Sequence, residues 1–270
     1  MEPVDIVDIL FRSCARSNQK RYIDVPKSEL LLGCLNSVLA SAAYAKKQDP
    51  SLELTVHVLD DHSDPQTVAA ILDLLEASGL PHEFVPMEET GQSASMRFAN
   101  EYARDNCGST SSPQAAELLY FVEDDYLHQE TAVHELLLAR RQFSANLGGR
   151  GVIISPCDHS VAYRAPALPT RVVLGAHRHW QLAVGTTSTY LISKKILKQY
   201  WPMYALHASY DPEEGGNVIC EANTINLIYR QEFCFSPLPS LTAHVSHTDL
   251  QPLYVPWEQW WKQFKVLKQV

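Results

Sequence analysis

The amino-acid sequence predicts an α/β fold in which a mostly parallel β-sheet is covered by helices on both faces. Strand-like and helix-like segments alternate through the first half of the chain, and the strand-like segments are too apolar to leave one face in water. With 270 residues and 46% hydrophobic residues, the chain can bury the core of one large α/β domain. We expect a single domain over residues 1–270, because the sequence contains neither an internal repeat nor a clean linker.

The first strand and the first helix follow from two patterns near the start of the chain. Residues 6–11 form a short apolar run, which predicts a buried strand. Ser28 is the expected N-cap of a helix whose apolar side chains recur on one helical face at Leu31, Cys34, Leu35, Val38, Leu39 and Ala42.

The second strand and helix have clearer boundaries. Residues 52–59 alternate between apolar and polar side chains and end at Asp60-Asp61. Asp64 as N-cap and Pro65 at the first helical position open the next helix, and Gly79 ends it.

The remaining elements are expected from shorter signals. We predict strands at residues 83–86, 117–122, 152–155, 186–193 and 233–235, and helices at residues 96–105, 131–143 and 218–230. The pattern is less regular after residue 156. We therefore expect residues 1–155 to be the ligand-binding half, residues 156–250 a specialised second half, and residues 251–270 an aromatic tail.

Three adjacent carboxylates, Glu123-Asp124-Asp125, end the expected strand at residues 117–122. Adjacent anions in a cleft repel one another and lose hydration, so the arrangement is costly unless a cation shares the site. Oxygen ligands suit Mg²⁺ or Mn²⁺, which commonly bind one or two carboxylates together with substrate phosphates. In a parallel sheet Asp60-Asp61 would lie at the same edge. The alternative is a solvated turn.

Composition narrows the class of partner and the compartment. The net charge of −9, with no run of Lys or Arg longer than two residues, argues against a nucleic-acid binder. No apolar stretch looks long enough to span a bilayer, and the amino terminus lacks the basic flank of a signal peptide. The six cysteines form no CxxC pair and suit reduced core thiols. We expect a cytoplasmic protein.

The order of motifs resembles that of the GT-A glycosyltransferases, which use nucleotide sugars, and in particular their inverting family-2-like members. Asp60-Asp61-His62-Ser63-Asp64 resembles the loop after their second strand, although His62 replaces a glycine. The turn from Gly91 to Asn100 is similar to their glycine-containing turn and the helix after it. Glu123-Asp124-Asp125 resembles the Glu-Asp-Asp form of their DxD motif. The likeness covers residues 4–248 and implies a Rossmann-like sheet.

The resemblance implies roles for individual residues on the donor side. Asp125 would ligate Mn²⁺ or Mg²⁺, Asp124 would contact the metal or the ribose, and Glu123 would contact the nucleoside. His247 would be a late metal ligand, with His244 as its competitor. The other residues expected at the nucleotide sugar are Phe11, Arg12, Ser13, Asp60, Asp61, Gln92 and Arg97.

The catalytic base and the acceptor contacts are expected in the second half. Glu221 is the preferred base, with Asp211, Glu213 and Glu214 as rivals; alternatively Glu221 only stabilises a helix N-terminus. Trp stacks on sugars and His donates to hydroxyls, so His179, Trp180 and Asp158 are candidates for sugar or acceptor contact. Against this, a Trp beside a strand is commonly a core residue.

The tail from residue 254 groups Trp257, Trp260, Trp261 and Phe264 with late lysines. Such a segment could contact a membrane at its inner face, where a lipid-linked acceptor would lie, or pack back onto the domain. We expect packing.

Three functions remain open. The first is a metal-dependent glycosyltransferase, inverting by resemblance, that acts on a glycan or glycolipid hydroxyl in surface polysaccharide or glycolipid synthesis. The second is a sugar-nucleotide nucleotidyltransferase, which normally needs a glycine-rich loop after the first strand, whereas Phe11-Arg12-Ser13-Cys14 contains no glycine. The third is a sugar-nucleotide-binding protein of the same fold without turnover.

Overall fold

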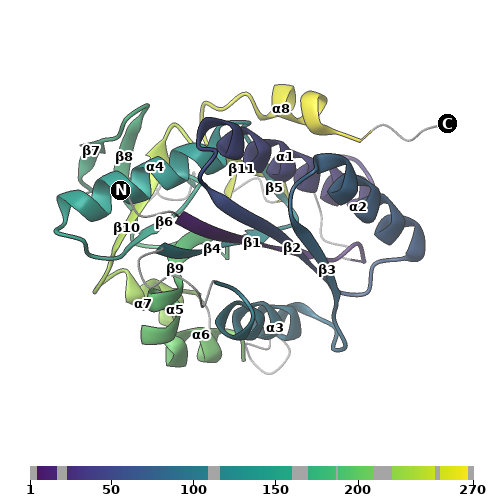
Figure 1. The fold of residues 1–270 in the computed structure, drawn as a ribbon, viewed down its shortest axis with the longest axis horizontal. Coiled ribbons are helices and arrows are strands. Elements are labelled where there is room, and N and C mark those ends of the chain that lie inside the picture. The colour runs from purple at the N-terminus through teal and green to yellow at the C-terminus, as the bar shows by residue number, and fades with distance from the viewer. Residues whose placement is uncertain are drawn as a thin grey trace.

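The computed structural model describes residues 5–16, 23–108, 116–159, 170–186, 188–209, 221–246 and 250–266. Within these ranges the chain forms a nine-stranded sheet in the order β3-β2-β1-β4-β9-β6-β10-β8-β7 and a small sheet of β11 and β5 (Figure 1). The strands are β1 (Asp5–Ser13), β2 (Glu53–Asp60), β3 (His82–Pro86), β4 (Ala116–Glu123), β5 (Tyr126–His128), β6 (Val152–Ile154), β7 (Val172–Leu174), β8 (His179–Leu182), β9 (Tyr190–Ser193), β10 (Phe233–Leu238) and β11 (Thr242–His244). The main sheet draws strands from both halves of the chain.

The first four strands run parallel, which confirms the expected largely parallel sheet of an α/β fold. Their register pairs Ser13 of β1 with Asp60 of β2, and Arg12 of β1 with Glu123 of β4. Strand β9 is antiparallel to both β4 and β6 and joins the parallel half to the less regular second half. The acidic strand ends therefore meet at one edge of the sheet, as the sequence predicted.

Helices cover both faces of the sheet, as Figure 1 shows. One layer contains α1 (Lys27–Gln48), α2 (Pro65–Ser78), α4 (Ala132–Asn146) and α8 (Trp257–Phe264); the other contains α3 (Gln92–Asp105), α5 (Lys194–Gln199), α6 (Trp201–His207) and α7 (Ile225–Ile228). Alternate side chains of a strand point to opposite faces. Phe11 of β1 accordingly packs in the core beneath α1, whereas Leu10 packs in the core beneath α3.

The two expected N-caps have different outcomes. Asp64 caps α2 as predicted, because its carboxylate accepts hydrogen bonds from the backbone N–H groups of Gln66 and Thr67, both at 3.0 Å. Gly79, at φ 64°, ends that helix in the left-handed conformation that glycine favours. Ser28 is not a cap: α1 begins one residue earlier, at Lys27, after Pro26.

The helix expected at residues 218–230 is broken in its described part. A 3₁₀ turn, η2 (Glu221–Asn223), precedes the short helix α7, and Thr224 between them has φ −128° and ψ −102°, far from helical values. The Thr224 hydroxyl lies 3.1 Å from Nδ1 of His207 on α6. This tertiary contact turns the chain where the sequence pattern predicted a continuous helix.

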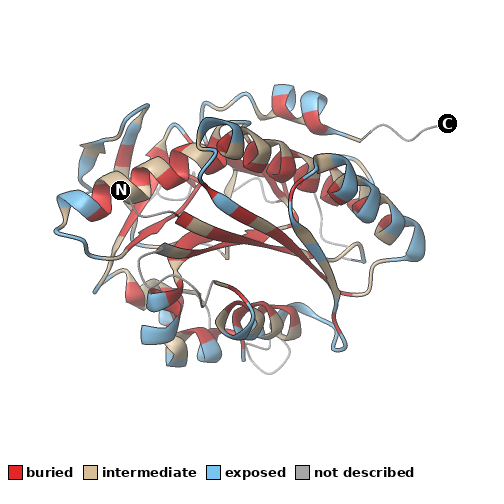
Figure 2. Ribbon diagram, viewed as in Figure 1, coloured by how far each residue is buried: buried red, intermediate tan, exposed pale blue. Residues whose placement is uncertain are grey.

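The sequence-based expectation that no apolar stretch could span a bilayer is wrong for α1. This helix has 22 residues and a mean hydropathy of 1.2 over its most apolar window, enough by length and composition to span a membrane. In the structure 61% of that window is buried, and α1 packs against α2, α4 and β5 (Figure 2). Its apolarity is accounted for by its place in the core.

The aromatic tail packs back onto the domain, as expected. Trp260 and Phe264 of α8 are buried in the core cluster that includes α1, and the Asn36 side chain donates a hydrogen bond to the Phe264 carbonyl at 2.9 Å. A methyl group at Gly33 of α1 would come within 2.4 Å of the Trp261 ring. Close contact between α1 and α8 thus depends on a glycine.

Candidate functional site

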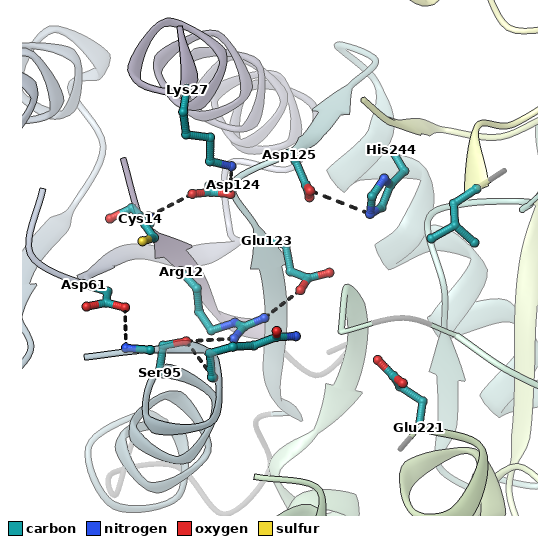
Figure 3. A pocket seen from close by; sticks show the side chains of 14 residues that line it. Arg12, Cys14, Lys27, Asp61, Ser95, Glu123, Asp124, Asp125, Glu221 and His244 are labelled. Carbon is teal, nitrogen blue, oxygen red and sulfur yellow. Dashed lines mark hydrogen bonds and ion pairs between the residues drawn. The ribbon is translucent and has the colours of Figure 1, made fainter. Parts of the chain in front are cut away.

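A cavity of about 360 Å³ opens where the carboxyl ends of β1, β2 and β4 meet (Figure 3). Ligands of parallel α/β sheets bind at this edge. Of the residues singled out from the sequence, those that line it are Arg12, Ser13, Asp61, Gln92, Glu123, Asp124, Asp125, Glu221 and His244. The structure therefore brings together most of the expected donor-side residues and the preferred base.

The three consecutive carboxylates divide between two directions. The Asp124 carboxylate forms an ion pair with the Lys27 ammonium at the start of α1 and accepts a hydrogen bond from the Cys14 N–H at 2.8 Å. All three carboxylates line the cavity, where Glu123 lies beside Arg12 and Asp125 points toward His244 (Figure 3). Glu123 ends β4, and Asp124-Asp125 form the turn before β5, so the chain changes direction within the three carboxylates.

Arg12 is the cation that pairs with Glu123, as Lys27 pairs with Asp124. Its guanidinium lies 2.7 Å from a Glu123 carboxylate oxygen and donates a second hydrogen bond to Ser95 of α3 at 3.1 Å. The β1–β4 register places the two residues directly opposite one another. Arg12 is therefore held between the acidic motif and the helix that borders the cavity.

Glu123, Asp125 and His244 form a set suited to a divalent cation. One ligand atom from each residue lies within 4.8 Å of the others, and Nε2 of His244 is 3.7 Å from an Asp125 oxygen. His244 reaches this position because β11 pairs with β5, placing His244 beside Tyr126. Two carboxylates and an imidazole are ligands that Mn²⁺ accepts.

This ligand set differs from the expected one. His247 lies outside the described residues, and His244, its competitor in the sequence, is the histidine beside Asp125. Asp124, expected at the metal or the ribose, lines the cavity and pairs with Lys27, whereas Glu123, expected at the nucleoside, lies with Asp125 and His244 in the group that could hold a cation. Sequence spacing could not reveal these pairings, because they depend on Lys27 of α1 and His244 of β11, which the fold brings to the turn after β4.

Electrostatics show that the cavity carries excess negative charge. Burial, opposed by Arg12 and reinforced by Asp125 and Asp124, raises the pKa of Glu123 to about 7. Burial also raises the pKa of Asp124, against the opposing effect of Lys27. Carboxyl groups that resist ionisation in this way are relieved by a bound cation.

The two aspartates at the end of β2, Asp60 and Asp61, make different contacts. Asp60 is buried and accepts hydrogen bonds from the hydroxyls of Ser13 and Ser63, both at 2.6 Å, so it organises the loop instead of lining the cavity. Asp61 lines the cavity and accepts a hydrogen bond from the Gly91 N–H at 2.9 Å. Of the two, Asp61 is the one available to a ligand.

Two other residues expected at the nucleotide sugar lie away from the cavity. Arg97 is on the exposed side of α3, 3.5 Å from Glu89, with 49% of its side chain accessible. Phe11 is fully buried beneath α1, because it points to the face of β1 opposite to Arg12. The structure gives neither residue a place in the cavity.

The residues expected to contact sugar or acceptor lie elsewhere in the sheet. Trp180 of β8 is 2% exposed, and its ring packs on Phe143 at 5.8 Å, which agrees with the alternative that it is a core residue. Asp158 is buried and accepts a hydrogen bond from Gln181 at 2.6 Å, and His179 is exposed near the far edge. None of the three lines the cavity.

Glu221 is the expected base whose position the structure describes. It begins η2 and faces the cavity across from Glu123 (Figure 3). Its rivals Asp211, Glu213 and Glu214 lie outside the described residues.

Five residues that line the cavity were not among the predicted site residues: Cys14, Lys27, Gly91, Ser95 and Leu250. Lys27 pairs with Asp124, the backbone of Cys14 donates to it, and Ser95 orients Arg12. A lysine at the start of the first helix, opposite the carboxyl end of β4, was the available signal. It becomes informative only when α1 is known to lie over β4.

No family model and no curated protein matches the chain. It is similar in structure to S. aureus TarS, with 14% identity and a TM-score of 0.44 over 82% of this chain and 33% of that one. It is also similar to the galactosyltransferase LgtC in complex with donor and acceptor sugar analogs, with 11% identity and a TM-score of 0.39 over 84% of this chain and 70% of that one. A third similar structure is a putative glucose-1-phosphate thymidylyltransferase from Bacillus anthracis, with 10% identity and a TM-score of 0.45 over 98% of this chain and 96% of that one. The chain thus spans a third of the length of TarS.

Proposed function

We propose that the protein is a metal-dependent glycosyltransferase that transfers a sugar from a nucleoside-diphosphate sugar to a hydroxyl acceptor. The observation that carries this proposal is the placement, around one cavity, of a metal-ligand set and a separate carboxylate. Glu123, Asp125 and His244 lie on one side, and Glu221 faces them from η2. Motifs that resemble those of GT-A enzymes supply the reaction class.

The donor is expected to lie along the edge of β1 and β2. Asp61 and Gln92 face the cavity from this side, and Asp61 can accept hydrogen bonds from the ribose or the base. Arg12 is placed to neutralise phosphate once a cation takes over its Glu123 partner.

Glu123, Asp125 and His244 would hold Mn²⁺ or Mg²⁺. A bound divalent cation would stabilise the charge that develops on the pyrophosphate leaving group. The chain itself must orient the sugar and accept a proton from the attacking hydroxyl. Glu221 is the proposed base, because its carboxylate faces the cavity opposite the acidic motif. Such an arrangement suits inversion at the anomeric carbon.

The acceptor we propose is a glycan or glycolipid hydroxyl of surface polysaccharide synthesis, used in the cytoplasm. Five described cysteines are free thiols, as is usual in a reducing compartment, and Trp260 and Phe264 of the tail are packed against α1, whereas Tyr254 is 94% exposed. We therefore place the reaction in solution or at the inner membrane face.

The test is thermal stabilisation by UDP, GDP and CDP with and without Mn²⁺. A diphosphate should raise the melting temperature only when Mn²⁺ is present, and Asp125→Ala should abolish that shift. Asp73→Asn, which changes an exposed carboxylate on α2, is the matched control and should keep it. A screen of nucleotide sugars for slow hydrolysis would then identify the donor.

Two results would contradict the proposal. Stabilisation by triphosphates in preference to diphosphates would favour a nucleotidyltransferase. If the Mn²⁺-dependent rise in melting temperature persists in Asp125→Ala, the metal does not bind at the acidic motif.

A further inference from the structure

A second group of potential metal ligands lies on the α3 side of the sheet, outside the cavity. It consists of Asp8 on β1, His57 on β2 and Cys107 just after α3, and all three side chains are buried. One ligand atom from each lies within 4.8 Å of the others. Asp8 precedes Arg12 by four residues on the same face of β1, so the group lies about 13 Å from the cavity at 3.3 Å per residue.

We propose that Asp8, His57 and Cys107 form a binding site for zinc or a similar borderline-soft divalent metal. The combination of carboxylate, imidazole and thiolate is typical of zinc and unlike the oxygen-rich set at Glu123 and Asp125. Tetrahedral zinc with these ligands separates the ligand atoms by roughly 3.3–3.6 Å. The observed cluster can reach such spacing by small side-chain rotations.

The surroundings of His57 provide an independent observation. Its Nε2 lies 2.7 Å from an Asp8 oxygen, while Nδ1 on the other side of the ring lies 3.3 Å from a Glu83 oxygen and 3.1 Å from the Tyr102 hydroxyl. Metal-binding histidines commonly donate their second ring N–H to a carboxylate, which fixes the tautomer and orients the ring. Glu83 occupies that second position here, with Tyr102 donating a hydrogen bond to it.

Backbone contacts hold the other two ligands in place. The Gly108 N–H donates to the second Asp8 oxygen at 2.8 Å, and the Lys194 ammonium donates to the Cys107 carbonyl. Burial and the Asp8 carboxylate raise the pKa of the Cys107 thiol, against the opposing effect of Lys194. A metal would reverse this preference, because it binds the thiolate.

Metal binding would release protons in a defined way. When the metal binds, the Cys107 thiol releases its proton to solvent. If Nε2 of His57 carries the proton of the hydrogen bond to Asp8, this proton is released as well. The proton shared by His57 and Asp8 competes with the metal for the same two ligand atoms. The proposal requires that zinc displaces it and ties β1 and β2 to the end of α3.

The test uses the full chain, stripped with a chelator and then loaded with Co²⁺ or Zn²⁺. Cobalt should give a thiolate-to-metal charge-transfer band in the unsubstituted protein, and this band should be lost in Cys107→Ser. The band should persist in Asp125→Asn, which separates this site from the cavity and keeps the test independent of the proposed reaction. Glu83→Gln should weaken zinc binding by about 10-fold or more, as loss of a histidine's carboxylate partner typically does.

His57→Gln is the second variant, and circular dichroism establishes that each variant is folded. In an Asp125→Asn background, which removes a ligand of the cavity set, zinc should raise the melting temperature, and His57→Gln in that background should abolish this rise. If neither variant folds, X-ray absorption of the zinc-loaded chain decides: one sulfur and several nitrogen or oxygen neighbours support the site, and a shell without sulfur overturns it. Absence of the cobalt band, or a band that survives in Cys107→Ser, also overturns it.

Discussion

At the scale of single residues, Glu123 determines how the stability of the protein responds to pH when a chelator keeps metal ions away. Its pKa of about 7 in the folded protein exceeds the ordinary value of 4.5, so the folded state binds the additional proton between these values. Stability from this group is therefore complete below pH 4.5 and is lost as the pH rises through 7. By linkage the loss is about 2 kcal/mol, reduced from the full shift because the side chain is partly exposed.

Glu123→Gln should remove most of this pH dependence. Urea unfolding in the presence of a chelator at pH 5 and pH 8 should show a smaller loss of stability in the variant than in the unsubstituted protein. Glu101→Gln, on the exposed face of α3, is the control and should behave like the unsubstituted protein. If the free energy of unfolding falls equally between pH 5 and pH 8 in Glu123→Gln and in the unsubstituted protein, Glu123 does not control this pH dependence.

The ion pair between Lys27 and Asp124 supports a second prediction at this scale. Both side chains are largely buried, with 8% and 12% exposure, so loss of Lys27 leaves a buried carboxylate without its cation. Lys27→Met should lower the free energy of unfolding by about 3 kcal/mol, as measured in urea. Lys47→Met, at an exposed position of the same helix, should have little effect.

The double variant Lys27→Met with Asp124→Asn distinguishes the cause. It should recover much of the lost stability, because neither partner is then charged. Additive losses would mean that the pair is not coupled.

At the scale of elements, the contact between α1 and α8 depends on Gly33. A Cβ at this position would meet the Trp261 ring at 2.4 Å, so Gly33→Ala should push α8 outward and cost about 1 kcal/mol or more. In a Trp261→Ala background the same change should stabilise the protein by up to about 1 kcal/mol, because alanine favours helix over glycine.

Urea unfolding of the four proteins, unsubstituted, two single variants and the double variant, measures this reversal of sign. The three atoms nearest to a Cβ at Gly33 all belong to the Trp261 ring of α8. If Gly33→Ala has the same effect in both backgrounds, α8 does not pack on α1 in solution.

Elements with local signals were predictable, and those fixed by distant contacts were not. The helix α2 follows from Asp64, Pro65 and Gly79, each acting within a few residues. The break between η2 and α7 depends on the contact of Thr224 with His207, which is 17 residues away in the chain. Local periodicity contains no information on such a contact.

At the scale of the whole molecule, the parallel sheet explains why residues far apart in the chain share one cavity. Arg12, Asp61 and Glu123 each lie at the carboxyl end of a different strand, and the parallel register aligns those ends. Rules for parallel sheets allowed this edge to be predicted from the sequence. These rules do not say which strand side chains face the cavity, and the predictions for Phe11 and Asp60 were wrong for this reason. The prediction for Arg97 was wrong because it lies on the exposed side of α3.

The sequence by itself determined the α/β class, the alternation of strands and helices, and the position of the acidic strand end. These follow from patterns of hydrophobicity and from residues that act within one turn or one strand. The tertiary structure alone decided that Lys27 would pair with Asp124, that His244 would join Glu123 and Asp125, and that Trp180 would be core. The physical reason is that each of these outcomes depends on which element covers which face of the sheet, a property of packing between segments distant in the chain.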